Sequence, residues 1–166
     1  RWLKIIIILY CSIGIALYYL QERFLFHPQK LSGTHVFRFN VPFEEINIPF
    51  NDTDTLNMIK FLPPDSVRKG VVLYFHGNKE NIERYAKFAG SYSRDRIIIY
   101  GKSFGTGIAS YVAAQTNNQR LILETPYYSI PSLFSSYAPI YPTGKMSNYK
   151  IPVYLFLQDV NYPVTI

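Results

Sequence analysis

The stretch "IIIYGKSFGTGIAS", residues 97–110, joins a run of apolar β-forming residues to a run of small residues typical of a helix. Gly101 and Gly105 flank Ser103 at the spacing G-x-S-x-G. In this pattern a serine occupies a sharp strand-to-helix turn with strained dihedrals, and the two glycines let the strand and the helix approach closely. We therefore predict that Ser103 is a nucleophile. The alternative is a phosphate-binding glycine loop, but the spacing Gly-x-x-x-x-Gly-Lys-Ser/Thr is absent.

A second motif, His76-Gly77-Asn78, ends the apolar run 69–75, which has the pattern of a strand buried on both faces. An acyl-transfer enzyme needs its oxyanion hole at this place, and the backbone N–H groups of Asn78 and Phe104 can converge there on one oxygen. His76 is an alternative candidate for the catalytic base, although a histidine here more commonly orders the loop.

The order of the expected elements predicts an α/β fold with a mostly parallel central sheet flanked by helices. Sites in such sheets lie at the carboxyl ends of the strands. A chain of 166 residues buries one core, so we expect a single domain after the N-terminal segment. The expected elements are a hairpin at 43–51 and 55–63, strands at 69–75, 96–103, 120–126, 151–159 and 162–166, and helices at 82–89 and 107–115.

The segment 127–150 is aromatic and rich in proline, and its pattern assigns no regular element. It is expected to form a cap or an irregular wall over the strand ends. Its aromatic side chains, between Tyr127 and Tyr141, either line an acyl pocket or serve only to pack the core or the cap.

The N-terminal segment is apolar from Ile5 to Leu20, which is roughly 24 Å of helix. We expect residues 1–23 to be a membrane-spanning signal anchor that meets the membrane through residues 3–20, with its orientation left open. A buried core helix and a cleaved signal peptide are the alternatives, and the second lacks a convincing small-x-small cleavage site. Residues 24–40 are then a connector, and 41–166 the folded domain.

The net charge of +6 does not indicate a nucleic-acid partner, because Lys and Arg are scattered and no basic run exceeds two residues. A basic face beside an anionic membrane surface explains the charge better. Cys11 is the only cysteine and lies in the apolar segment, so the chain has neither a disulfide framework nor a thiolate zinc site.

The HGN loop, the GKSFGTG turn and the stretch "LILETPYYSI" resemble the α/β-hydrolase superfamily. In particular they resemble its small N-terminally membrane-anchored serine hydrolases, a group that includes protein depalmitoylases. The stretch "YYLQERFLFHPQ" is similar to that group as well, and the resemblance runs from Leu3 to Ile166. It implies the α/β-hydrolase fold, Ser103 as nucleophile, Asn78 and Phe104 as backbone oxyanion donors, loop support from His76, Gly77, Gly101 and Gly105, and no metal or organic cofactor.

Two members of the expected catalytic triad are in doubt. The family places its histidine after the nucleophile, yet His27, His35 and His76 all precede Ser103. Asp159 is either the triad acid or a solvated loop carboxylate, the latter being favoured. Glu124 is either an alternative acid or a carboxylate that braces the adjacent loop, and here too the structural role is favoured.

The family also places a helix, a strand and a second helix between the HGN strand and the nucleophile strand, whereas this chain has only residues 79–95 there. We therefore expect residues to be absent between Asp95 and Arg96, and again after Phe156, within 156–166. A continuous chain at Asp95–Arg96 would contradict this expectation.

Three functions are compatible with these patterns. The first is a membrane-anchored serine hydrolase that cleaves an ester or thioester, or alternatively an amide, of a small-molecule or acylated substrate through a Ser103 acyl-enzyme. The second is a non-catalytic binding or scaffold protein of the same fold. The third is a serine aminopeptidase, which shares the same turn.

Overall fold

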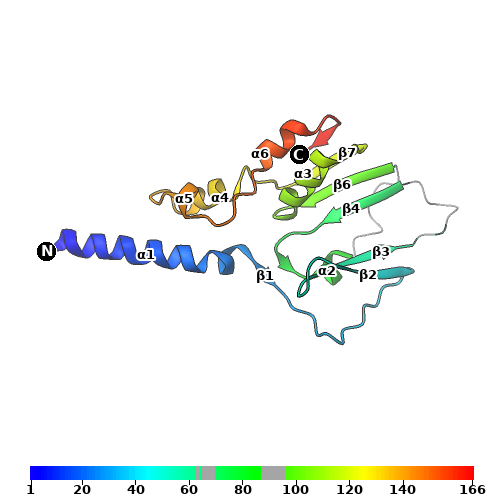
Figure 1. Ribbon diagram of the computed structural model, residues 1–166, viewed down its shortest axis with the longest axis horizontal. Coiled ribbons are helices and arrows are strands. Elements are labelled where there is room, and N and C mark those ends of the chain that lie inside the picture. The colour runs from blue at the N-terminus through cyan, green and yellow to red at the C-terminus, as the bar shows by residue number, and fades with distance from the viewer. Residues whose placement is uncertain (63, 65–69, 87–95) are drawn as a thin grey trace.

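The computed structural model describes residues 1–62, 64, 70–86 and 96–166 (Figure 1). It shows a mixed α/β protein with parallel sheets and an N-terminal apolar helix. In chain order the elements are α1 (Trp2–Leu25), β1 (His27–Pro28), β2 (Phe43–Pro49), β3 (Thr55–Phe61), β4 (Gly70–Phe75), β5 (Lys79–Glu80), α2 (Ile82–Ala86), β6 (Arg96–Lys102), α3 (Gly105–Gln115), β7 (Arg120–Glu124), α4 (Ile130–Tyr137), α5 (Thr143–Met146), α6 (Val153–Phe156), the 3-10 turn η3 (Leu157–Asp159) and β8 (Val164–Thr165).

The main sheet has the strand order β4-β6-β7-β8, and every neighbouring pair in it is parallel. The carboxyl ends of β4, β6 and β7 therefore lie at the same end of the sheet. The loop after β4 carries the HGN motif and the turn after β6 carries Ser103. The predicted parallel sheet is confirmed, and it brings the two motifs to the same edge.

Helix α3 packs on one face of this sheet and forms the core with it. The buried cluster joins small residues of the helix to branched residues of the strands, namely Ile99, Ala109, Ala113, Leu121 and Leu123. Alanines at the contact let α3 lie close to β6, where burial of each large aliphatic side chain contributes about 1.5–3 kcal/mol. This close approach fixes the start of α3 against the end of β6.

The expectation that residues 69–75 form a strand buried on both faces is wrong for the described part of that strand. Val71 in β4 is 59% exposed, and its neighbour in the register, Ile97 in β6, is 49% exposed. The apolar run was taken to indicate a central strand. Within the described residues β4 is instead an edge strand, and the cluster under α3 does not include this end of the sheet.

The predicted hairpin is confirmed, with β2 and β3 antiparallel and in register from Phe43↔Phe61 to Pro49↔Thr55. Its turn is held by Asn51, whose Oδ1 accepts hydrogen bonds from the backbone N–H groups of Thr53 at 2.9 Å and Asp54 at 2.7 Å. The hairpin forms a two-stranded sheet of its own.

The segment 151–159 was predicted as a strand, and this is wrong: it forms α6 and η3. Pro152 precedes the first turn of α6, where a missing N–H costs nothing. Phe156 then packs edge-on against Tyr111 of α3, with ring centroids 5.3 Å apart. Tertiary packing thus overrides the β-forming composition of the segment. The strand predicted at 162–166 is confirmed as β8, which pairs with β7.

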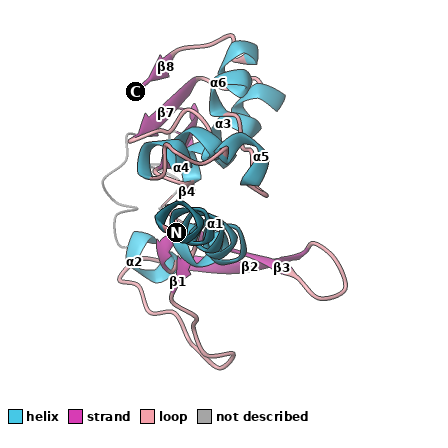
Figure 2. Cartoon of the chain, turned by 90° about the vertical axis from the view of Figure 1, so that its left-hand side faces the viewer, coloured by secondary structure: helices cyan, strands magenta, loops and turns pink. Residues whose placement is uncertain are grey.

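The segment 127–150, which no pattern assigned, forms the short helices α4 and α5. Ser129 caps α4, because its Oγ accepts a hydrogen bond from the N–H of Ser132 at 3.2 Å. Viewed along α1, these two helices lie directly beside it (Figure 2).

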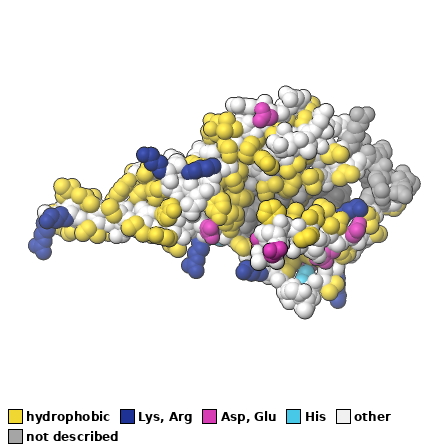
Figure 3. All heavy atoms as spheres, in the orientation of Figure 1, with side chains coloured by type: hydrophobic (Ala, Val, Ile, Leu, Met, Phe, Trp, Pro, Cys, Tyr) yellow, Lys and Arg dark blue, Asp and Glu magenta, His cyan; other side chains and the backbone are white. Residues whose placement is uncertain are grey.

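Helix α1 extends two residues beyond the predicted anchor. The expected connector contains β1, which pairs in parallel with β5. The helix is long and apolar enough to cross a membrane, and a signal sequence or the core helix of a soluble protein would also meet that criterion. Apolar side chains cover its surface, with Arg1 and Lys4 at its N-terminal end (Figure 3).

Two predictions fall partly outside the described residues. The predicted helix at 82–89 is present as α2, Ile82–Ala86, and its remaining residues, among them Ala89, are not described. The expected break at Asp95–Arg96 also involves an undescribed residue, Asp95.

Candidate functional site: the Ser103 turn and its apolar cavity

Ser103 lies at a sharp turn between β6 and α3, as the spacing of the glycines predicts. Its φ is +51°, in the left-handed region that non-glycine residues rarely adopt. The Ser103 N–H donates to the carbonyl oxygen of Glu124 at 2.8 Å, and its carbonyl oxygen accepts from the N–H of Thr106 at 3.0 Å. The backbone is thus held from both sides, while the side chain is exposed.

The two glycines of the motif are required by contact with backbone. A Cβ on Gly101 would lie 2.7 Å from the Cα of Thr106, and one on Gly105 would lie 2.5 Å from the carbonyl oxygen of His76. Both distances are far below van der Waals contact. Gly101 lets α3 approach β6, and Gly105 lets the start of α3 pass over the end of β4.

The HGN loop lies beside the serine. A Cβ on Gly77 would be 3.5 Å from the Cβ of Ser103, so this part of the loop faces the nucleophile directly. In the part of the chain that the structure describes, the backbone N–H groups of Asn78 and Phe104 donate to no other residue. Both donors are therefore available to a ligand, and Phe104 immediately precedes the N-terminus of α3, where the helix dipole favours negative charge.

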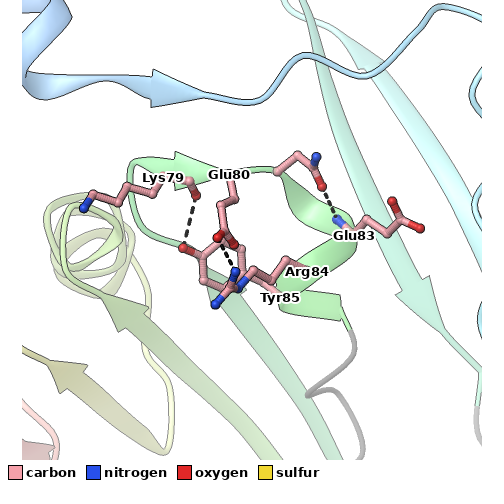
Figure 4. Close-up of polar contacts among 6 residues, drawn as sticks. Lys79, Glu80, Glu83, Arg84 and Tyr85 are labelled. Carbon is pink, nitrogen blue, oxygen red and sulfur yellow. Dashed lines mark hydrogen bonds and ion pairs between the residues drawn. The ribbon is translucent and has the colours of Figure 1, made fainter.

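The loop that carries Asn78 is supported by the residues that follow it (Figure 4). The hydroxyl of Tyr85 donates to the carbonyl oxygen of Lys79 at 3.1 Å, and Arg84 pairs with Glu80. The ring of Tyr85 also stacks on His76, with centroids 4.9 Å apart. The imidazole Nδ1 of His76 lies 2.7 Å from the carbonyl oxygen of Gly77. These contacts fit the loop-ordering role considered for His76.

Asn78 also links the loop to the N-terminal helix. Its side-chain amide donates to the carbonyl oxygen of Leu25, the last residue of α1. Its own carbonyl oxygen accepts from the N–H of His27 at 3.1 Å. The end of α1 is thus tied to the loop that faces Ser103.

A cavity of about 490 Å³ opens at Ser103. This volume is within the range of small-molecule sites. Ser103, Asn78 and Phe104 lie at its floor, and the rest of its wall is mainly apolar and aromatic. One side comes from α1 and the other from α4, α5 and the segments next to them; the lining residues outside the floor include Leu17, Phe24, Leu25, Tyr127, Leu133, Phe134, Tyr137 and Met146.

Most polar side chains of the cavity wall are already engaged within the protein. The hydroxyl of Thr143 donates to the carbonyl oxygen of Pro131 at 3.0 Å, and that of Ser147 donates to Tyr149 at 2.5 Å. Gln21 bonds to the backbone of α5 and the loop after it. Among the described residues, the Ser103 hydroxyl makes no hydrogen bond. The cavity wall is therefore mainly apolar, and the Ser103 hydroxyl is among its free polar groups.

The contribution of α1 to this cavity was not foreseen from the sequence. Gln21 carried the available signal, because a polar residue at the end of an apolar helix needs partners if it is buried. It is 3% exposed; its Nε2 donates to the Tyr18 carbonyl at 2.7 Å, and its Oε1 accepts from the N–H of Asn148 at 2.8 Å. Gln21 therefore joins α1 to the segment that follows α5.

Glu124 braces the strand end next to the nucleophile, the role favoured for it from the sequence. It accepts hydrogen bonds from Lys102 and from the Tyr100 hydroxyl. The hydrogen bond from Lys102, followed by that from Tyr100, lowers the pKa of Glu124 below its usual value. The carboxylate is therefore ionised at neutral pH, and its backbone carbonyl holds the N–H of Ser103.

Tyr127 closes the cavity on the side of α3. Its hydroxyl lies 3.4 Å from the carbonyl oxygen of Phe104, and burial raises its pKa above the usual value. The phenol is thus neutral at physiological pH, and it holds the first residue of the α3 turn.

The structure does not bring Asp159 to Ser103. Asp159 is exposed, and it is absent from the cavity lining. It precedes β8, whose direction is parallel to that of β6. Close to Asp159 in the chain, the Tyr162 hydroxyl donates to the carbonyl oxygen of Ala113, near the C-terminal end of α3. Ser103 lies just before the N-terminal end of the same helix. This position fits the alternative of a loop carboxylate, and the role of Asp159 as the acid stays a prediction.

The three histidines are also absent from the lining of the cavity. His27 is exposed after α1, and His35 pairs with Glu83 at 3.5 Å. His76 stacks on Tyr85, as described above. Among the described residues, no cluster of three or more His, Cys, Asp or Glu side chains could hold a metal ion.

No protein-family model matches the chain. No solved structure matches it significantly either.

Proposed function

We propose that this chain carries the nucleophile of a membrane-anchored serine hydrolase with an α/β-hydrolase fold, which cleaves an ester or thioester. The observation that carries the proposal is Ser103 at φ +51°, with its hydroxyl free at the floor of an apolar cavity. The fold assignment rests on the order of motifs along the parallel sheet. The resemblance of the sequence to anchored hydrolases agrees with this assignment.

The acyl group of the substrate would lie in the cavity, because its wall offers an acyl chain apolar contact and few unpaired polar groups. Ser103 Oγ attacks the carbonyl carbon, and the negative charge that develops on the oxygen is stabilised by the N–H groups of Asn78 and Phe104. The C–O or C–S bond then breaks and the leaving group takes a proton. Water hydrolyses the acyl-enzyme and restores the serine.

The base that takes the serine proton is assigned to a histidine outside residues 1–166. The proposal places it there because no histidine of this chain follows Ser103 or lines its cavity. His76 is a poor candidate for this role, because its Nδ1 and its ring face already contact Gly77 and Tyr85.

The proposal is tested by the hydrolysis of p-nitrophenyl esters by the full-length protein. Ser103→Ala should lower kcat/KM at least about 10³-fold, because the nucleophile is lost. Ser135→Ala is the matched control: this serine is exposed on α4 and does not line the cavity, so its activity should equal that of the wild type. Equal activity of Ser103→Ala and the wild type would overturn the proposal.

A second candidate function is the binding of acyl groups without cleavage. It is favoured by one observation, that none of the three histidines lines the cavity. In that case a fluorescent fatty acid would bind the wild type and Ser103→Ala equally. Neither protein would hydrolyse any of the p-nitrophenyl esters.

A further inference from the structure

Helix α1 contacts the segment that joins α4 to α5 around Tyr10 and Gly14. The ring of Tyr10 stacks on that of Tyr141, with centroids 4.6 Å apart and planes at 9°. The Tyr10 hydroxyl donates to the carbonyl oxygen of Ile140 at 3.1 Å, and the Tyr141 hydroxyl donates to that of Tyr10, also at 3.1 Å. A Cβ on Gly14 would lie 3.0 Å from the Tyr141 ring. These contacts fix α1 beside residues 140–141.

The position of these contacts along α1 determines what enters a membrane with it. The apolar run is Ile5 to Leu20, and Tyr10 lies inside it. At about 1.5 Å per residue, Tyr10 is roughly 15 Å from Leu20 along the helix axis. Insertion of the whole run therefore carries the segment that contacts Tyr10 to membrane depth as well.

The outer surface of that segment is suited to such an environment. Tyr137 is 81% exposed and Ile140 is 70% exposed, and the carbonyl oxygen of Ile140 contacts Tyr10 of α1, whose apolar side chains are also exposed. The sequence has no Asp or Glu between Glu124 and Asp159, and the exposed Lys145 lies in α5. Apolar and tyrosine side chains are typical of protein surfaces that contact a bilayer, and a cation such as Lys145 is suited to anionic lipid headgroups.

Several backbone polar groups in this segment have partners within the protein, as a lipid environment favours. The N–H of Tyr141 donates to the carbonyl oxygen of Ala138 at 3.1 Å, and that of Thr143 donates to the carbonyl oxygen of Tyr141 at 2.8 Å. The carbonyl oxygen of Ile140 accepts from the Tyr10 hydroxyl. These hydrogen bonds lower the free-energy cost of moving the loop between α4 and α5 out of water.

We propose that α4, α5 and the loop between them enter the membrane together with α1, with Tyr137 and Ile140 in contact with lipid. The proposal rests on insertion of α1 and does not depend on catalysis at Ser103. The partner is a bilayer that contains anionic lipid. The cavity lies between the same elements, so a lipid acyl chain reaches it without crossing bulk water.

The test is the quenching of tryptophan fluorescence by brominated phosphatidylcholine in vesicles that also contain phosphatidylglycerol. The 166-residue chain has one tryptophan, Trp2, whose quenching in the wild type reports on α1. Trp2→Phe is then combined with Tyr137→Trp or with Ile140→Trp. The matched control is Trp2→Phe with Phe50→Trp, because Phe50 is 82% exposed beside the hairpin turn, away from α1.

We expect Trp2 and the tryptophans at 137 and 140 to lose at least about half of their fluorescence, and the tryptophan at 50 to lose almost none. Either of the two positions suffices, so misfolding of one variant leaves the other to decide. Quenching of Trp2 without quenching at 137 and 140 would overturn the proposal while leaving α1 as an anchor. Absence of quenching at all positions would overturn both.

Discussion

The Ser103 backbone is held in an unfavourable conformation by hydrogen bonds that the sequence motif does not name. A left-handed serine costs about 1–3 kcal/mol and persists only where its surroundings impose it. Here the carbonyl of Glu124 and the N–H of Thr106 impose it. The glycine spacing was enough to predict the turn. The partners that hold it come from β7 and α3, and their contact with Ser103 depends on the assembled sheet.

Gly105 gives a prediction about stability. Gly105→Ala should lower the free energy of unfolding by about 2 kcal/mol or more, because the new methyl group meets the backbone carbonyls of Phe75 and His76, which cannot move away as a flexible side chain would. Gly144→Ala is the control, since nothing lies within 4 Å of the added Cβ. It lies in helix α5 and should be neutral or stabilising by up to about 1 kcal/mol. Urea unfolding in detergent measures both, and equal stabilities would contradict the observed packing.

Glu124 gives a prediction about pH. Its pKa is lowered in the folded protein, so its ionised form contributes stability at neutral pH that is lost as the pH falls through the lowered pKa, below the reference value of 4.5. Glu124→Gln should therefore be less stable than the wild type at pH 7, by less than about 1 kcal/mol because the pair is partly exposed. The difference should become smaller as the pH falls below 4.5. A constant difference between pH 3 and pH 7 in urea unfolding would contradict this account.

The short elements around the cavity show what pattern analysis missed. The apolar run of α1 predicted a helix, but its role in the cavity wall depends on contacts with residues more than 120 positions away, such as Gln21 with Asn148. The strand expected at 151–159 forms the helix α6 and the 3-10 turn η3, because Phe156 packs on Tyr111 of α3. Short apolar runs fit a strand and a buried helix equally well, and only tertiary contacts decide between them.

Gln21 tests the contact between α1 and the cap. Gln21→Leu keeps the bulk but removes the part-buried hydrogen bond from the N–H of Asn148, so the free energy of unfolding should fall by about 0.5–1.5 kcal/mol. The change would be seen as a lower melting temperature in detergent. Gln29→Leu, at an exposed glutamine after β1, should melt like the wild type. Equal melting of both variants and the wild type would show that this hydrogen bond does not hold α1 in place.

The whole molecule joins a parallel sheet to an apolar helix through the loop that carries Asn78. The sheet and the meeting of its two motifs at one edge could be predicted, because parallel strands and short loops leave few arrangements. The packing of α4 and α5 on α1 could not, because segment 127–150 has no periodic pattern and its position is set by long-range contacts such as that of Tyr10 with Tyr141. The part of the site that follows local motifs was thus predictable, and the cavity was not.

The central claim is that Ser103 is a nucleophile, and covalent labelling tests it most directly. The full-length protein is treated with an alkyl fluorophosphonate and digested, and the adduct is located by peptide mass spectrometry. The account predicts one adduct on Ser103, absent from Ser103→Ala and retained in Ser135→Ala. A folded wild-type protein that carries no adduct on Ser103, or a Ser103→Ala variant labelled to the same extent, would contradict it.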